Sequence, residues 1–228
     1  MRARIPTGCN LLDRFLEGGL PPESITLVYG EAETGKTTFA MQCAVNTARS
    51  DFKTIFIDSD NTFASERLSQ IASVDLEDVS ASIILIRPDS FGEQGTVIDS
   101  LEKYITEKFG LVAVDTVTSL YRSELGTAEE SFALNRELNR QVATLAQLSK
   151  ARGISILLTS QVRSVPAAGI TEVTPLATRV LDFWADYVVS LKRTSETNVI
   201  LATLEKPPRR GSRFRLLLGE EGIHDCVR

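Results

Sequence analysis

The sequence predicts an α/β fold: a mostly parallel sheet, flanked by helices on both faces, with an antiparallel C-terminal extension. Strand-like and helix-like segments alternate from residue 24 to about residue 161, which is the rhythm of an open parallel sheet. The strand-like runs are nearly continuous apolar stretches, as expected for strands that are buried on both faces. At 228 residues, the chain fits a single domain spanning 1–228.

Each element is expected from its own local pattern. Strands are expected at residues 24–30, 54–60, 82–88, 111–116 and 154–161. Helices are expected between them at 36–49, 63–71, 93–109 and 129–151. Residues 162–175 show no clean period and are expected to form a loop, followed by a short helix at 176–184. Strand-like runs with short connections at 185–193, 198–205 and 213–219 predict the antiparallel extension.

The composition excludes several classes of protein. No apolar run approaches the ~20 residues that a membrane helix needs, and the opening MRARIPTGCN lacks the apolar stretch of a secretory signal. Cys9, Cys43 and Cys226 form no CxxC pair, so we expect neither a disulfide framework nor a zinc site, and a cytoplasmic location fits best. Because the net charge is −5, any contact with nucleic acid has to come from a local basic patch.

The stretch GEAETGKTT has the G-x-x-x-x-G-K-[ST] spacing of a phosphate-binding loop between a strand and a helix. Its glycines let backbone N–H groups surround phosphates, and the following helix points its positive end at them. Lys36 is expected to reach the β- and γ-phosphates, and the Thr37 hydroxyl to bind Mg²⁺. The alternative is a plain glycine turn before a helix. The expected nucleotide-binding residues are Gly30, Glu31, Ala32, Glu33, Thr34, Gly35, Lys36, Thr37 and Thr38.

An acidic residue at the end of a buried strand would complete such a site. Asp115 follows the apolar run LVAV and is suited to hold Mg²⁺ through water. The alternative for Asp115 is the capping of a turn.

Hydrolysis needs a further group that orients or deprotonates water. Asp58 and Asp60 both close the second strand, so both are candidates for this role. Gln161 closes the fifth strand, where its amide could contact the γ-phosphate and pass that contact to the following segment. A solvated strand end is the alternative for Gln161.

The stretch KPPRRGSRFR is a candidate DNA-binding turn, because five cations occur there within ten residues and no acidic residue does. Its prolines and glycine predict a hairpin-like turn that presents the charges to solvent, and a merely solvated turn is the alternative. The residues concerned are Lys206, Arg209, Arg210, Arg213 and Arg215.

Four stretches together resemble the ATPase core of the RecA/RadA recombinases. They are PTGCNLLDRFLEGGLPPESITLVYGEAETGKTT, FIDSDNTFASERL, LVAVDTVTSLYRSEL and ILLTSQV, and they match in order and spacing. The pair Asp115-Thr116 and the segment NTFASERL favour this family over the similar KaiC-like ATPases, which share the IPTG…LD…GG opening. The chain looks most like the short archaeal accessory paralogues of this family, which consist of the core without the N-terminal helical domain and the segment through which protomers polymerise.

The resemblance implies a RecA-like P-loop core that binds ATP, Mg²⁺ and DNA, with weak hydrolysis, in homologous recombination and DNA repair. It implies single-stranded or branched DNA, a RadA-type recombinase and a Holliday-junction resolvase as partners, and a homo-oligomer as one state of the chain. It also makes Asp60 the counterpart of a catalytic glutamate, with Lys36 and Gln161 completing the catalytic set. Because Asp is shorter than Glu by one C–C bond, roughly 1.5 Å, we expect a misplaced base and slow turnover.

By the same resemblance, residues 121–135 and the segment after Gln161 match two DNA-binding loops, and both are poorly basic here. Three functions therefore stay open. The first is an ATP-dependent DNA-binding accessory protein with slow hydrolysis. The second is a nucleotide-gated binding module without turnover, and the third is a KaiC-like signalling ATPase that does not engage DNA.

Overall fold

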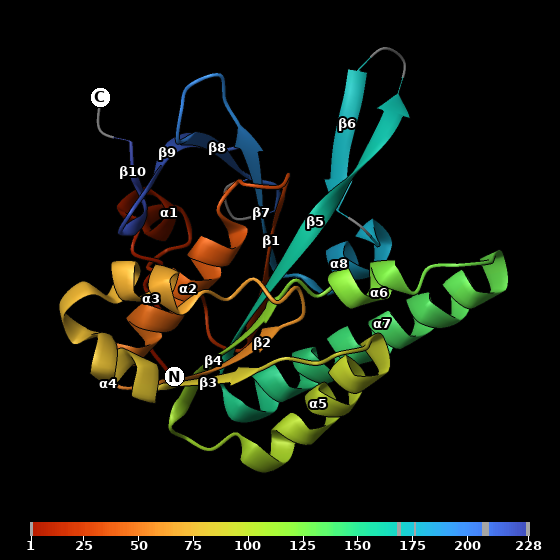
Figure 1. Cartoon of the computed structure of the whole chain (residues 1–228), viewed down its shortest axis with the longest axis horizontal. Coiled ribbons are helices and arrows are strands. Elements are labelled where there is room, and N and C mark those ends of the chain that lie inside the picture. The colour runs from red at the N-terminus through yellow and green to blue at the C-terminus, as the bar shows by residue number, and fades with distance from the viewer. Residues whose placement is uncertain (1, 168–169, 176, 207–209, 227–228) are drawn as a thin grey trace.

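The structure, a computed structural model, describes residues 2–167, 170–175, 177–206 and 210–226. Within these residues, one sheet has the strand order β10-β9-β8-β7-β1-β5-β4-β2-β3, and β6 pairs only with β5 (Figure 1). The mostly parallel sheet predicted from the sequence is confirmed. Among the described residues, no helix is both long enough and apolar enough to cross a membrane.

The parallel core aligns the strand ends that carry the candidate residues. It comprises β1 (Ser24–Gly30), β5 (Ser155–Ala167), β4 (Phe109–Asp115), β2 (Lys53–Asp58) and β3 (Ile83–Ile86). All residues of β1 and β4 are buried, which explains their continuous apolar runs. In register, Gly30 lies opposite Gln161, and Asp58 lies opposite Asp115. The carboxyl ends of the parallel strands therefore meet at one edge.

Helices cover both faces of this sheet and enclose two apolar cores. The first face is covered by α1 (Asn10–Phe15), α2 (Lys36–Ala48), α3 (Ser65–Ala72), the 3-10 turn η1 (Ser73–Asp75) and α4 (Leu76–Ala81). The second face is covered by α5 (Phe91–Tyr104), α6 (Ser119–Ser123), α7 (Ala128–Arg152) and α8 (Thr178–Trp184).

The C-terminal extension is antiparallel from its second strand onward. Its strands are β7 (Tyr187–Arg193), β8 (Val199–Leu204), β9 (Arg213–Gly219) and β10 (Gly222–Asp225). The first of them, β7, pairs with β1 in parallel, whereas β8, β9 and β10 follow as antiparallel neighbours. The predicted antiparallel extension is confirmed, because β7, β8 and β9 are antiparallel neighbours. The structure adds that β7 joins the extension to β1 in parallel and that β10 follows β9.

Two further expectations were wrong. Residues 162–167 and 170–175 are not a loop, because β5 continues to Ala167 and pairs with β6 (Ile170–Pro175) as an antiparallel ribbon. The β-branched residues of this segment favour a strand, and its prolines are tolerated where a strand lacks a second neighbour. The helix expected at 93–109 ends at Tyr104, because Phe109 pairs with Lys53 in the sheet.

Candidate functional site

The phosphate-loop stretch connects the buried end of β1 to the start of α2, as its spacing predicts. Gly35 has φ +82°, a left-handed conformation that favours glycine, and it caps the N-terminus of α2. A Cβ atom added at Gly30 would collide with the carbonyl oxygen of Leu191 on β7. One added at Gly35 would lie 3.0 Å from Leu218 on β9. Close approach of the β7 backbone therefore requires glycine at position 30, whereas the left-handed φ favours glycine at position 35.

Lys36 is a desolvated cation at the centre of this loop. Its side chain is buried, and its Nζ donates a hydrogen bond of 2.6 Å to the carbonyl oxygen of Glu31. Burial lowers the pKa of Lys36, while the nearby charges of Asp115 and Asp60 oppose that shift. An anion brought to this loop would further favour the charged form of the amine.

Asp115 ends β4 and is fully buried. Its Oδ1 accepts a hydrogen bond from the Thr159 hydroxyl, whereas its Oδ2 has no hydrogen-bond partner. Burial raises the pKa of this carboxyl group, and the Thr159 hydroxyl acts in the opposite direction. A buried oxygen without a partner is costly, so this orphaned atom fits a role in holding a hydrated cation.

The two candidate bases at the end of β2 have different surroundings. Asp58 is fully buried and accepts from the backbone N–H groups of Thr62 and Phe63, at 3.0 and 3.1 Å. It also accepts from Nε of Arg87 at 3.1 Å. These partners occupy both of its oxygens and fold the 58–63 turn, so Asp58 is committed to structure.

Asp60 is only half-buried, and its carboxylate contacts side chains from α6 and β5. Its Oδ1 accepts from the Ser119 hydroxyl, and its Oδ2 accepts from Nε2 of Gln161 at 3.0 Å. The same Gln161 accepts at Oε1 from the guanidinium of Arg122, at 2.9 Å. Asp60 and Gln161 therefore lie in contact, together with two partners, Ser119 and Arg122. Both partners lie in the stretch LVAVDTVTSLYRSEL, but sequence reasoning gave them no role.

The turn between β8 and β9 presents fewer free cations than its sequence suggests. Lys206 is turned back onto the protein, donating to the carbonyl oxygen of Ala185 at 2.6 Å and pairing with Asp182 at 3.4 Å. Arg215, on β9, pairs with Glu196 in the turn between β7 and β8. These contacts engage two of the five cations of the turn.

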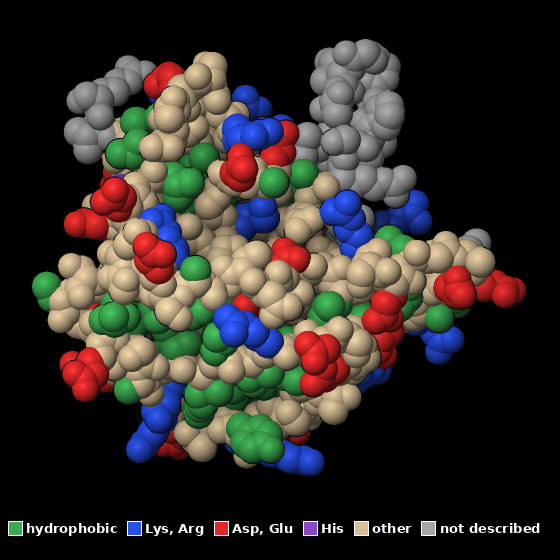
Figure 2. Space-filling model, viewed as in Figure 1, with side chains coloured by type: hydrophobic (Ala, Val, Ile, Leu, Met, Phe, Trp, Pro, Cys, Tyr) green, Lys and Arg blue, Asp and Glu red, His purple; other side chains and the backbone are tan. Residues whose placement is uncertain are grey.

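The structure describes the exposure of two of the other three cations of the turn. Arg210 and Arg213 are exposed, and Arg209 lies outside the described residues. On the face drawn in Figure 2, described Lys and Arg side chains are interspersed with Asp and Glu. A local patch therefore has to carry any attraction for DNA.

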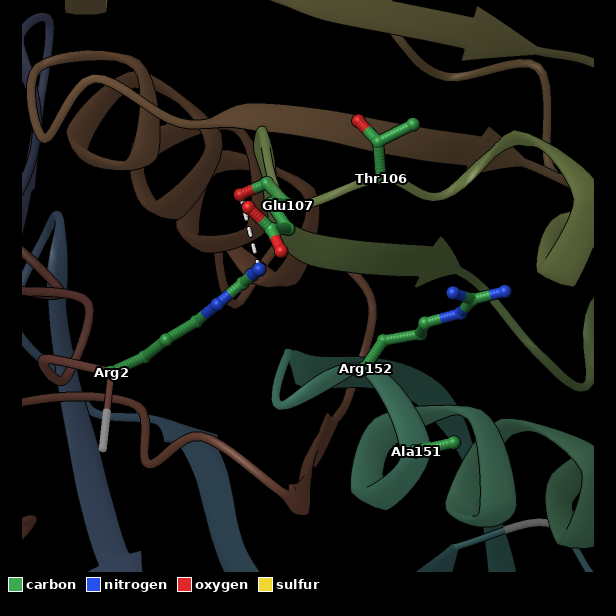
Figure 3. A pocket seen from close by; sticks show the side chains of 5 residues that line it. All are labelled: Arg2, Thr106, Glu107, Ala151 and Arg152. Atoms are coloured by element: carbon green, nitrogen blue, oxygen red, sulfur yellow. Dashed lines mark hydrogen bonds between the residues drawn. The ribbon is translucent and has the colours of Figure 1, made fainter.

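A separate hollow of about 490 Å³ lies where β4 begins and α7 ends (Figure 3). Arg2 points into it and donates to the carbonyl oxygen of Glu107 at 3.0 Å, while Arg152 lines another side. This hollow is at the amino edge of the parallel strands. It is therefore distinct from the site at their carboxyl ends.

Comparison with known proteins places this geometry in a family. The Rad51 family model matches residues 2–226. The chain belongs to the Rad51 family. This membership confirms the resemblance to the recombinase ATPase core that the sequence motifs predict.

Similar proteins indicate the branch of the Rad51 family to which the chain is most similar. One relative, "DNA repair and recombination protein RadB" of Thermococcus onnurineus (strain NA1), is 33% identical and covers 98% of both chains. A protein of the same name from Methanococcoides burtonii is 35% identical over 72% of each chain. A solved structure, "Crystal structure of the RadB recombinase", is 31% identical with a TM-score of 0.85, covering 98% of this chain and 100% of that one. The likeness to this branch of the family that the sequence predicts is confirmed.

Proposed function

We propose that this Rad51-family chain binds ATP with Mg²⁺ and binds DNA, and that it acts as an accessory factor in homologous recombination and DNA repair, with weak ATP hydrolysis. One observation carries the proposal: Lys36, Asp115 and the Asp60–Gln161 pair converge beside the phosphate loop at the carboxyl edge of the sheet. Ligands of open α/β sheets bind at this edge.

Each residue of the site has a defined task in this proposal. The loop from Gly30 to Thr38 surrounds the phosphates, and the Lys36 ammonium faces the γ-phosphate. The Thr37 hydroxyl and the orphaned oxygen of Asp115 would hold Mg²⁺, which neutralises phosphate charge when bound. Asp60 orients the attacking water.

Weak turnover follows from the surroundings of Asp60. Its carboxylate is shorter than that of a glutamate, and both of its oxygens accept hydrogen bonds from neighbouring side chains. A base that is held away from the reacting water loses much of its effect. The same contacts of Asp60 also favour the second candidate function, a nucleotide-gated binding module without turnover.

The DNA and partner assignments rest on the relatives and on the basic turn. The relatives are named as DNA repair and recombination proteins, and Arg210 and Arg213 extend into solvent. In this proposal the chain binds single-stranded or branched DNA, cooperates with a RadA-type recombinase and a Holliday-junction resolvase, and can form a homo-oligomer.

Two measurements test the proposal. The first is ATP affinity and turnover with and without single-stranded DNA, where we expect tight binding and slow, DNA-responsive turnover. The second is DNA affinity as a function of salt, where counterion release predicts a steep decline. ATP binding without turnover would support the gated module, and ATP binding without DNA affinity would support a signalling ATPase.

A further inference from the structure

We propose that Gln94 is a positioning residue that holds the turn bearing Asp60 against the segment that follows Asp115. The proposal rests on the proposed function, because positioning matters for a reaction at those two carboxylates. It concerns a buried side chain that lies on α5, outside the sequence motifs of the site.

Gln94 and Gln141 are fully buried amides within an otherwise apolar core between the sheet and the helices α5 and α7. Burying an amide is unfavourable unless its hydrogen-bonding groups are paired. Two buried amides with unsatisfied hydrogen-bonding groups would destabilise this core, so each of their polar atoms needs a partner.

The pairing of these two amides is complete. Oε1 of Gln94 accepts from the Ser59 hydroxyl at 2.7 Å. Nε2 of Gln94 donates to the carbonyl oxygen of Val117 at 3.3 Å and to Oε1 of Gln141 at 2.9 Å. Nε2 of Gln141 donates to the carbonyl oxygen of Phe91 at 3.2 Å and to Glu137 at 3.0 Å. Every amide proton has an acceptor, which fixes the orientation of both side chains.

The contacts of Gln94 join the two segments that carry the candidate chemistry. Ser59 lies between Asp58 and Asp60, and Val117 is two residues beyond Asp115. The backbone N–H of Ser59 also donates to the carbonyl oxygen of Asp115 at 2.8 Å. Gln94 thus contacts the turn after β2 and the segment after β4 with one amide.

The outer end of the network is fixed at the protein surface. Glu137 pairs with Arg140 at 2.7 Å, and Arg140 pairs with Asp99 of α5 at 2.6 Å. The Arg140–Asp99 pair joins α7 to α5 at the surface behind the two glutamines. The hydrogen-bond network that ends at Ser59 therefore spans both helices.

The variant Gln94→Met tests this role, since it keeps the volume of the side chain and removes all three hydrogen bonds. The matched control is Gln42→Met, which removes three buried hydrogen bonds of the same kind, to Thr7 and Ile223, away from both segments. A loss of general stability would affect both variants, whereas a loss of positioning would affect only the first.

The first readout is hydrogen exchange of the Ser59 backbone amide in the nucleotide-free protein. We expect Gln94→Met to accelerate it about tenfold or more, and Gln42→Met to leave it unchanged. Equal exchange in both variants would overturn the proposal. This readout needs no turnover, so it decides the proposal even if the wild-type chain proves inactive and the proposed hydrolysis fails.

The second readout is a double-mutant cycle with Asp60→Asn. We expect Gln94→Met to lower turnover about tenfold or more while changing ATP affinity by less than about twofold, because displacing a catalytic group by about 1 Å can cost about 100-fold. In the Asp60→Asn background it should have no further effect. Independent, additive losses would show that Gln94 does not act through Asp60.

If Gln94→Met does not fold, Ser59→Ala removes one bond of the network and is measured in the same two ways.

Discussion

The side-chain amide of Gln161 donates a hydrogen bond to the carboxylate of Asp60, across 3.0 Å and 101 positions of sequence. Gln161 lies within β5, and that strand runs on without interruption into the ribbon with β6. The candidate base is therefore linked to the ribbon that stands where the sequence predicted a loop.

The first prediction concerns Gln161→Ala, which removes this link. We expect ATP affinity to change by less than about twofold, because Lys36 and the phosphate loop are untouched. The effect of DNA on turnover should disappear, since β5, which continues into the ribbon, would lose its hydrogen bond to Asp60. Turnover with and without DNA checks this, and Gln70→Ala on the exposed side of α3 is the control. A variant that still responds to DNA would place the communication elsewhere.

The second prediction concerns the length of the Asp60 side chain. Asp60→Glu should raise turnover by roughly 10- to 100-fold, because it moves the carboxylate toward the reacting water. Asp60→Asn should lower whatever turnover remains, and ATP affinity should be nearly unchanged in both. Steady-state hydrolysis and equilibrium binding measure the two effects. Undiminished hydrolysis by Asp60→Asn would exclude Asp60 as the base and would point to a residue of a partner, because Asp58 is occupied by Arg87 and the turn.

The third prediction concerns Lys36→Ala. We expect ATP affinity to fall roughly 10- to 100-fold or more, because a hydrogen bond to a charged group contributes about 1.5–3 kcal/mol. Titration with a fluorescent ATP analogue measures the loss, and Lys103→Ala, at the exposed end of α5, is the matched control. Unchanged affinity would reduce the loop to a plain glycine turn.

The fourth prediction concerns pH. Burial lowers the pKa of Lys36 below its ordinary value of 10.5, so part of the free protein carries a neutral amine on the alkaline side. Bound phosphates favour the ammonium, so ATP binding should take up protons in the alkaline range below the ordinary lysine pKa, and affinity should decline as the pH rises through that range. Calorimetry in two buffers of different ionisation enthalpy measures the uptake. Lys36→Arg, which stays charged, should show none, and equal uptake by that variant would assign the proton to another group.

The fifth prediction concerns the turn between β8 and β9. Replacing Arg209, Arg210 and Arg213 with Ala should weaken DNA binding and lower its salt slope by roughly 2–3 units, at about 0.7–0.9 per lost phosphate contact. Lys206→Ala should leave the slope unchanged, because Lys206 is engaged by Asp182 and Ala185. Fluorescence anisotropy over a range of salt concentrations checks both variants. A wild-type slope in the triple variant would move the DNA site to the β5–β6 ribbon.

Local pattern was sufficient to predict the strands of the parallel core and the phosphate loop. The apolar run at 24–30 identifies a strand, because burial on both faces leaves a continuous apolar stretch. The glycine, lysine and threonine at 35–37 identify the phosphate loop, because its left-handed turn favours glycine. The ribbon at 162–175 was missed because its pairing partner comes from the same irregular stretch.

The choice between Asp58 and Asp60, by contrast, required the folded chain. The two residues are nearly equivalent in sequence, and they differ because Arg87 occupies one while Gln161 and Ser119 contact the other. Hydrogen bonds of this kind join residues that are tens of positions apart. They depend on strand order and register, which no short stretch of sequence records. The inward turn of Lys206 has the same origin, since its partners lie on α8 and at the end of that helix.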